Sequence, residues 1–274
     1  MITLMFVESM DSTVAVIVCS FGMKTLTDSV VKQLHAESTG VAIVIVDNGD
    51  DFPENASYPS SVHVLRPGVN LGWAAGSNLG IEFCLTRLGV DSVVLLNNDV
   101  ELSQRFLTGL QAAARSSGAW IVAPCYDHNW PHQRFDFCGS PSDFKAKDLE
   151  HEVPFVDGTC LWASSKALRL AGPLDTDHWP QWNWGCDKDL CMRVRNLGGK
   201  VVVTERAYLS HYARATASGI AGFSEQEAEL ENDLGMAKKW GPDWEESLYS
   251  GFPELSRRGI VQLKLRDSES VRGE

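Results

Sequence analysis

The sequence lacks long hydrophobic runs and lacks an excess of positive charge. No window approaches the roughly 18 consecutive apolar residues of a membrane-spanning helix, and the apolar start soon turns acidic, unlike a secretory signal. The 274 residues carry 24 Lys and Arg against 36 Asp and Glu, a formal net charge of −12 at pH 7. We therefore expect no transmembrane segment and no nucleic-acid partner, because phosphate backbones bind basic faces.

Paired cysteines and common nucleotide-binding motifs are also missing. The seven cysteines are odd in number and scattered, and they contain no C-x-x-C pair, so we expect a reduced, cytoplasmic protein, either free or peripheral at a membrane. No G-x-G-x-x-G or G-x-x-x-x-G-K-[ST] follows a strand-like run. This argues against nicotinamide-dependent dehydrogenases and P-loop nucleotide hydrolases.

What the first half does contain is an alternation of strand-like and helix-like segments. Short runs dense in β-branched residues, typical of strands buried on both faces of a parallel sheet, occupy 13–20, 41–47, 61–66 and 92–97. Helices are expected at 23–38, 72–88 and 103–116. This alternation predicts an α/β fold with an open, mostly parallel sheet and right-handed crossovers. Gly72, Gly76 and Gly80, spaced by four, predict a smooth stripe that lets one helix lie close to the sheet.

The character of the sequence changes after Pro124. Residues 125–152 are polar and irregular, which predicts a long excursion over the sheet. Beyond them we expect a strand at 153–164, helices at 166–172 and 189–199, a strand pair at 201–212 and a polar helix from about 220. The predicted organisation is one domain over 1–220 and a helical, charged tail over 221–274. Within the domain, a nucleotide-binding half spans about 13–124 and an acceptor half about 125–220.

Polar residues follow three of the predicted strands at the point where each strand ends. Ser20 closes the first strand, Asp47 the second, and Asn97, Asn98 and Asp99 follow the fourth. Ligands of open α/β sheets bind beyond the carboxyl ends of the strands, so these side chains are candidates for a binding site. Each of them is also a common turn former, which leaves a local structural role open.

Seven blocks of the sequence, taken in order, resemble the family 2 glycosyltransferases. The blocks are VAVIVCSFG, IVIVDNGDD, RPGVNLGWAAGSNLGIEF, VVLLNNDVEL, VDGTCLWASSKALRLAGPLD, WGCDKDLCMRVRNLGGKVV and AYLSHY. The resemblance covers about residues 13–212 and is nearest to the rhamnosyl- and galactofuranosyl-transferase branch. It implies a GT-A fold with a Rossmann-like nucleotide-binding half. It also implies an inverting, metal-dependent enzyme of polysaccharide biosynthesis that moves a sugar from a nucleoside-diphosphate donor to an acceptor hydroxyl.

The resemblance implies a metal site and a donor site. Asn97, Asn98 and Asp99 align with the DXD-type motif, so Asp99 is expected to bind Mn²⁺ or Mg²⁺ together with His211. Asn97 is expected at the ribose, with Asn98 beside it in the nucleotide-sugar site. Asp47 aligns with the carboxylate that accepts a hydrogen bond from the base. The family lines the rest of its nucleoside pocket at the positions of Ser20, Arg66, Asn70, Gly72 and Asn78.

Asp187 falls at the aspartate that serves the family as catalytic base. The glutamate that usually precedes it is Cys186 here, which removes an acidic neighbour. The acceptor hydroxyl is a poor nucleophile and needs a carboxylate to take its proton. Asp187 also has a structural interpretation as a helix N-cap, and Asp189 is the alternative candidate for the base.

Three tryptophans stand directly before the predicted base. Trp179, Trp182 and Trp184 lie within six residues, and each indole N–H needs a partner when buried. Aromatic faces stack on sugar rings, so these residues predict a platform for a saccharide or glycoconjugate acceptor, lipid-linked acceptors included. The alternative is a packed loop that anchors the following helix.

Two other functions remain open from the sequence. A nucleotidyltransferase acting on a sugar phosphate would also use a metal at the sheet edge, although its Gly-rich phosphate loop is missing. A catalytically inactive nucleotide-sugar-binding module would account for the departures at Cys186 and Asn97. The sequence does not select among UDP, dTDP and GDP donors.

Overall fold

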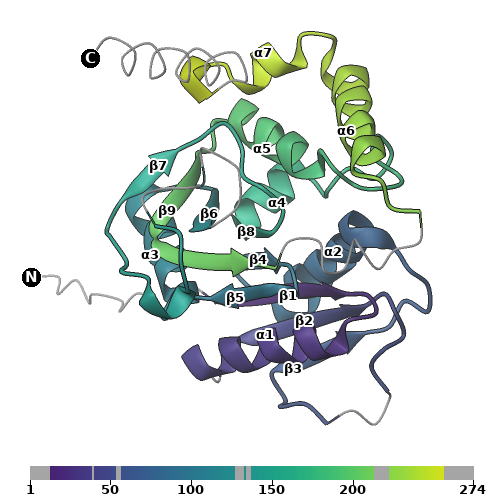
Figure 1. The fold of residues 1–274 in the computed structure, drawn as a ribbon, viewed down its shortest axis with the longest axis vertical. Coiled ribbons are helices and arrows are strands. Elements are labelled where there is room, and N and C mark those ends of the chain that lie inside the picture. Colours follow the sequence, from purple (N-terminus) through teal and green to yellow (C-terminus); the bar gives the residue numbers. More distant parts are fainter. Residues whose placement is uncertain are drawn as a thin grey trace, which may run out of the picture.

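The computed structural model describes residues 13–38, 40–53, 57–126, 133, 137–212 and 222–255. Within these residues one nine-stranded sheet carries helices on both faces (Figure 1). The predicted α/β fold with an open sheet is therefore confirmed. The expectations for residues 1–12 and for the charged end of the tail at 256–274 lie outside the described residues.

The first half of the sheet is parallel, as the sequence predicts. Its strands are β1 (Val14–Ser20), β2 (Ala42–Asp47), β3 (Val62–Leu65) and β4 (Ser92–Leu96), in the spatial order β3-β2-β1-β4. β1 pairs in parallel with both β2 and β4, and the register places Ser20 opposite Asp47. Two polar strand ends are thus brought side by side at one edge.

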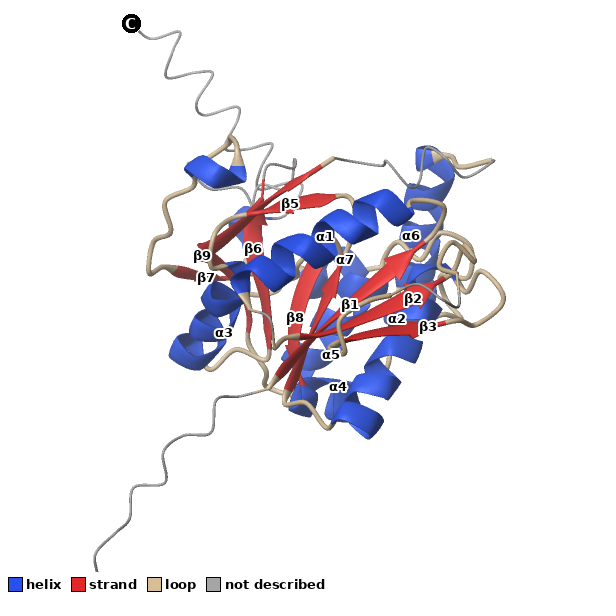
Figure 2. Ribbon diagram, turned by 90° about the horizontal axis from the view of Figure 1, so that it is seen from below, coloured by secondary structure: helices blue, strands red, loops and turns tan. Residues whose placement is uncertain are grey.

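The helices of this half divide between the two faces of the sheet. They are α1 (Lys24–Glu37), α2 (Gly72–Phe83), which ends in a π-helical turn (Cys84–Leu88), and α3 (Phe106–Ser117). Buried residues of α1 and α3 share one apolar cluster with the sheet, and those of α2 share the other. Figure 2 shows α1 crossing in front of the strands. All three helices were predicted.

Two glycines of the predicted stripe let α2 lie close to the sheet. A Cβ on Gly80 would stand 2.5 Å from Cγ2 of Ile17 on β1, and one on Gly76 would stand 3.1 Å from Sγ of Cys19. Gly72 has another role, because it begins the helix with a φ of +75°, a conformation that favours glycine.

The second half of the sheet is mixed. Its strands are β5 (Val100–Leu102), β6 (Ile121–Tyr126), β7 (Glu150–Glu152), β8 (Cys160–Ser164) and β9 (Val201–His211). β8 runs antiparallel between β4 and β6, β6 pairs in parallel with β9, and β5 and β7 pair antiparallel with β9. The strand predicted at 153–164 forms only over its last five residues, and β5, β6 and β7 were not predicted. Part of the predicted excursion at 125–152 lies outside the described residues.

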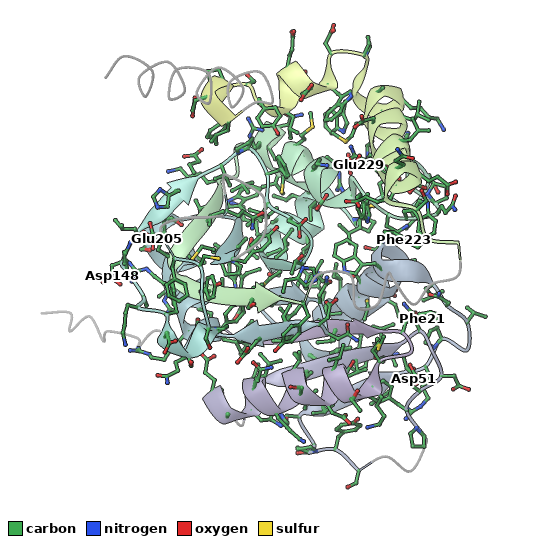
Figure 3. All side chains as sticks on the ribbon, viewed as in Figure 1. Phe21, Asp51, Asp148, Glu205, Phe223 and Glu229 are labelled. Atoms are coloured by element: carbon green, nitrogen blue, oxygen red, sulfur yellow. The ribbon has the colours of Figure 1, made fainter. Side chains whose placement is uncertain are left out.

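Residues 201–211 form one strand and not the predicted strand pair. The polar residues inside it coincide with a register shift, at which Thr204 faces Pro124 and Tyr208 faces Cys125. Glu205 is buried there and pairs with Lys147 and His151. These ion pairs satisfy polar groups that would otherwise interrupt the strand. Figure 3 shows Glu205 and Asp148 on the side of the molecule away from Phe21 and Asp51.

The chain ends in helices that pack on the second half of the sheet. They are α4 (Ser165–Ala171), α5 (Cys186–Asn196), α6 (Glu225–Trp240) and α7 (Trp244–Leu248), with 3-10 turns at Pro141–Asp143 and Pro253–Leu255. The helix predicted in the tail is α6, and its Met236 belongs to the same buried cluster as Leu190 of α5. Residues 222–255 are therefore part of the folded unit. None of the described helices has the length and apolar character that crossing a bilayer requires.

The close contact of α2 with β1 gives a first prediction. Gly80→Ala should lower the free energy of unfolding by about 1–3 kcal/mol, because the new methyl group overpacks the contact with Ile17. Urea denaturation measures the change. Gly40→Ala is the control, since a Cβ at Gly40 meets no atom within 4 Å. Equal stability of the two variants would mean that α2 can move away from β1 at no cost.

Candidate functional site

Two strand ends meet on one threonine of α1. The hydroxyls of Ser20 and Thr27 lie 2.8 Å apart, and Asn98 donates from Nδ2 to Oγ1 of Thr27 over 3.1 Å. All three side chains are buried. The ends of β1 and β4 are thus joined through α1, and the predicted residues Ser20 and Asn98 do lie together. Thr27 was not predicted, because nothing in a helix sequence marks a hydroxyl that points at a strand end.

Asp47 shapes the loop that follows β2. Its two carboxylate oxygens accept hydrogen bonds from the main-chain N–H groups of Asp51 (2.9 Å) and Phe52 (3.0 Å). Arg66, which directly follows β3, stabilises the same loop by donating to the carbonyl oxygens of Phe52 and Pro53. The structural role left open for Asp47 is therefore observed. Each carboxylate oxygen retains a further lone pair beyond these two hydrogen bonds.

The start of α2 is fixed against this edge by two asparagines. Asn48 donates to the Gly72 carbonyl oxygen (3.0 Å) and accepts from the Leu71 N–H (3.3 Å), while Asn70 accepts from the Gly72 N–H (2.9 Å). Asn70 and Gly72 thus lie beside the strand ends. Asn48 belongs to the polar run expected at the end of the second strand, but it was assigned no role in the site.

Asn78 does not fit the predicted nucleoside pocket. Its amide donates to the carbonyl oxygen of Leu174 (2.8 Å) and accepts from the N–H of the same residue (2.9 Å). Both ends of the side chain therefore tie α2 to the segment after α4. We correct its role to a structural one.

Asp99 and His211 come together across two paired strands. Asp99 Oδ1 and His211 Nε2 lie 3.1 Å apart, and both side chains are largely buried. The antiparallel pairing of Val100 with His211 and the hydrogen bond from the Tyr212 N–H to the Asp99 carbonyl oxygen fix this arrangement. Asn97 is half-buried beside it, and its N–H donates to Thr159.

This pair is chemically suited to a divalent cation. A hard carboxylate oxygen with an imidazole nitrogen matches the ligands of Mn²⁺ or Mg²⁺. Among the described residues no group of three His, Cys, Asp or Glu side chains converges on one point. Any ion held by Asp99 and His211 would therefore need further oxygen ligands, and a diphosphate supplies such oxygens.

Asp187 lies in the first turn of α5, two residues after the N-cap Gly185. Its carboxylate accepts hydrogen bonds from the main-chain N–H groups of Gly158 (2.9 Å) and Lys188 (2.7 Å). Burial raises the pKa of Asp187 to about 6, and the nearby Asp157 carboxylate adds to the shift, although Lys188 and the two hydrogen bonds oppose it. The helix cap is Gly185, so the N-cap interpretation of Asp187 is wrong. Its carboxylate can exchange protons near neutral pH.

Gly158, which donates to the Asp187 carboxylate, lies against the ring of Trp73. A Cβ on Gly158 would lie 2.9 Å from Cη2 of Trp73 and 3.6 Å from Oδ2 of Asp187, so the indole ring of α2 covers the glycine that donates to the carboxylate. Neither residue was predicted. The signal was available, because Asp157 and Gly158 follow an apolar run as Asp47 and Asp99 do.

Cys186 gives no substitute for the missing glutamate. Its thiol is buried and donates to the carbonyl oxygen of Asp175 over 3.0 Å. Burial, followed by the nearby Asp187 and Asp189 carboxylates, raises the pKa of Cys186 far above that of an ordinary thiol. The side chain therefore stays neutral.

Asp189 is excluded as the alternative base. It is fully buried, with Oδ2 2.9 Å from Arg193 Nε and Oδ1 2.8 Å from Lys239 Nζ. Oδ1 also accepts a hydrogen bond from the indole N–H of Trp240 (3.0 Å). Lys239 bonds in turn to Asp175. These contacts join α5 to α6 and leave Asp189 no path to a substrate.

The three predicted tryptophans have different environments. Trp179 is fully buried against Gly185 and Gly235 and donates to the Asn232 carbonyl oxygen (3.3 Å), so its assignment to the acceptor platform is wrong. Trp182 and Trp184 are only partly buried. They are the two tryptophans of this loop that remain partly exposed.

Comparisons with known proteins show the family and the fold. The family described as "Glycosyl transferase family 2" matches residues 16–169. An uncharacterized protein of Mycobacterium tuberculosis is 32% identical over 72% of this chain and 73% of its own length. The dTDP-rhamnosyl transferase RfbF of Shigella flexneri is 21% identical over 57% of this chain and 54% of its own.

A solved structure shares the fold. The crystal structure of GalNAc-T7 with UDP, GalNAc and Mn²⁺ superposes with a TM-score of 0.60 at 15% identity, over 89% of this chain. This chain spans about half of that protein, 51% of its length. With the α/β sheet and the polar strand edge described above, these matches identify the class: the chain belongs to glycosyl transferase family 2 and has a GT-A-like fold.

The buried ion pairs of Asp189 give a second prediction. Asp189→Asn should lower the free energy of unfolding by about 3–5 kcal/mol, because Arg193 and Lys239 lose the buried partner they share. Urea denaturation measures the loss, and the exposed Asp177→Asn should change little. A stable Asp189→Asn protein without sugar-transfer activity would return Asp189 to the role of base.

Proposed function

We propose that this glycosyltransferase moves a sugar from a pyrimidine nucleoside-diphosphate donor to an acceptor hydroxyl by a single, metal-assisted displacement with inversion. The carboxylate of Asp187 is the observation that carries this proposal. It is partly buried at the start of α5, held by two main-chain N–H groups, and has a pKa of about 6. A base of this kind is largely ionised at neutral pH and can still accept a proton.

The donor is expected at the edge formed by β1, β2 and β4. Ser20, Asp47, Asn97 and Asn98 present polar groups there. In support, RfbF is named for a dTDP-sugar and the GalNAc-T7 structure contains UDP, and both nucleotides carry a pyrimidine. Asp47 can accept the ring N–H of such a base through its remaining lone pairs. The transferred group is proposed to be a hexose or deoxyhexose.

Asp99 and His211 would hold the metal, Mn²⁺ or Mg²⁺. When bound, the ion neutralises the negative charge that develops on the diphosphate leaving group. The remaining chemistry falls to Asp187. The acceptor oxygen forms a bond to the anomeric carbon, the bond from that carbon to the diphosphate oxygen breaks, and the acceptor proton passes to the Asp187 carboxylate.

The acceptor is expected near Trp182 and Trp184, on the loop that leads into Asp187. A sugar ring has apolar faces that match indole rings, so we propose a saccharide or glycoconjugate acceptor, with lipid-linked glycans in this class.

The role of Asp187 gives a third prediction. Asp187→Asn should lower kcat on the order of 100-fold or more while donor affinity is kept, because the base is lost and the donor edge is untouched. In the wild-type protein kcat/KM should fall as the pH drops through about 6, where the carboxylate takes up a proton and cannot act as a base. Steady-state kinetics with UDP- and dTDP-sugars from pH 5 to 8 measures both effects.

The exposed Asp177→Asn is the matched control. It should retain the wild-type kcat and the fall of kcat/KM at acid pH. Wild-type turnover by Asp187→Asn would remove the base assignment. If both proteins bind the donor and neither releases nucleoside diphosphate, the result would favour a catalytically inactive binding module.

The Asp99–His211 pair gives a fourth prediction. EDTA should abolish activity, and Mn²⁺ or Mg²⁺ should restore it. Calorimetry should show weak metal binding to the free protein and much tighter binding with UDP or dTDP, since two protein ligands leave the ion dependent on diphosphate oxygens. Asp99→Asn should lose this coupling and His211→Ala should weaken it. Full activity in EDTA would overturn the metal assignment.

A further inference from the structure

The main chain of the aromatic loop is held by one carboxylate of α6. Glu231 accepts hydrogen bonds from two successive N–H groups, with Oε1 2.7 Å from the Gln181 nitrogen and Oε2 2.7 Å from the Trp182 nitrogen. Such charge-assisted bonds are short and strong. Since they act on neighbouring peptide groups, they fix the direction in which the Trp182 side chain leaves the loop.

The other side of the loop is held by α2. Asn183, with a φ of +62°, donates to the Trp179 carbonyl oxygen (2.7 Å) and accepts from the N–H of Ala74 (2.9 Å). The loop is therefore clamped between α6 and the helix that begins at the donor edge. Trp182 and Trp184 stand on either side of this asparagine, so their rings are carried by a segment whose main chain is hydrogen-bonded on both sides.

A third aromatic ring approaches these two from the start of α6. The ring centroid of Phe223, one residue before the N-cap Ser224, lies 5.1 Å from that of Trp182 and 6.2 Å from that of Trp184. Phe223 is only partly buried. Figure 3 shows it on the same side of the molecule as Phe21, which follows β1, and Asp51, which follows β2. The three rings thus lie on the side of the donor edge.

The cluster also contains an unsatisfied hydrogen-bond donor. The indole N–H of Trp182 is buried and has no hydrogen-bond partner within the described part of the chain. A buried donor without an acceptor is unfavourable, and less than 1 Å² of this nitrogen is exposed, so an oxygen can reach it only if a neighbouring ring shifts. Sugars have apolar ring faces, which is the chemistry that three aromatic rings can recognise.

We propose that Trp182, Trp184 and Phe223 form a cradle for the acceptor sugar and that Glu231 is its positioning residue. This inference rests on the proposed sugar transfer and adds to it a specificity role for α6. The family match ends at residue 169, so the loop and α6 lie in the part of the chain beyond that match. Trp179 is fully buried and packs in the core, so the other two tryptophans of this loop are the ones that a ligand can contact.

The test compares two glutamates of the same helix. Glu231→Gln keeps the shape of the side chain but replaces one accepting oxygen by an N–H₂ group, which repels a main-chain N–H of the loop. Its acceptor KM should rise about tenfold, the effect of losing one charge-assisted hydrogen bond, while donor KM is unchanged. Glu229→Gln is the matched control, since Glu229 is exposed on α6 (Figure 3) and should behave as wild type.

The ring of Phe223 is tested in the same way. Phe223→Leu should raise acceptor KM, and Phe223→Tyr, which keeps the aromatic face, should restore it. Urea denaturation of every variant separates positioning from stability, because a merely structural role would lower the midpoint without separating acceptor KM from donor KM. Equal changes in both constants, or no change in either, would overturn the cradle.

A binding measurement separates this inference from the proposed function. Saturation-transfer NMR with methyl glycosides of glucose, galactose and rhamnose, in the presence of UDP and Mn²⁺, should show contact with the wild-type protein and a weaker signal with Glu231→Gln. If these signals are seen but the protein transfers no sugar, the acceptor cradle is supported and the transfer activity is refuted. Transfer activity with unchanged acceptor KM in Glu231→Gln would refute the cradle alone. The absence of a signal from all three glycosides in wild type would also overturn it.

Discussion

The parallel pairing of β1 with β2 and β4 is the constraint on which the proposed donor side of the site depends. Parallel strands end at the same edge, so the chain direction alone brings the residues after each strand together. The register then sets Ser20 beside Asp47. Because Thr27, Asp51 and Phe52 supply partners for Ser20, Asn98 and Asp47, these polar groups are buried without leaving hydrogen bonds unmade.

The side of the site that holds Asp187, the proposed base, is built by another principle. Asp187 owes its place to contacts among three elements that do not pair as strands: the first turn of α5, the peptide of Gly158, and Trp73 of α2. The ion pairs of Asp189 and Asp175 with Lys239 join α5 to α6, and α6 in turn holds the aromatic loop through Glu231. The donor edge is therefore regular and defined by the sheet, whereas the opposite side is irregular and defined by side chains.

This difference decides what the sequence could predict. Buried parallel strands are nearly continuous runs of β-branched residues, so β1, β2 and β4 were recognised from composition. β6 was not, because Pro124 lacks an N–H and interrupts a strand pattern, and the sheet accommodates it where the register with β9 shifts. Trp179 cannot be told from Trp182 by sequence, since the room for its ring comes from Gly185 and Gly235, fifty residues apart. The pairing of Asp189 with Arg193 had a usable signal, the i,i+4 spacing on one helix face.

The pairing of β5 with β9 has a consequence for how the protein reaches its working state. Asp99 and His211 are 112 positions apart in the sequence and meet only through this edge pairing. Closing so long a segment of chain has an entropic cost, which the pairing of β5 with β9 must offset. The pair is assembled only in the folded protein, so the proposed divalent ion, when bound there, would stabilise the folded state over the unfolded chain.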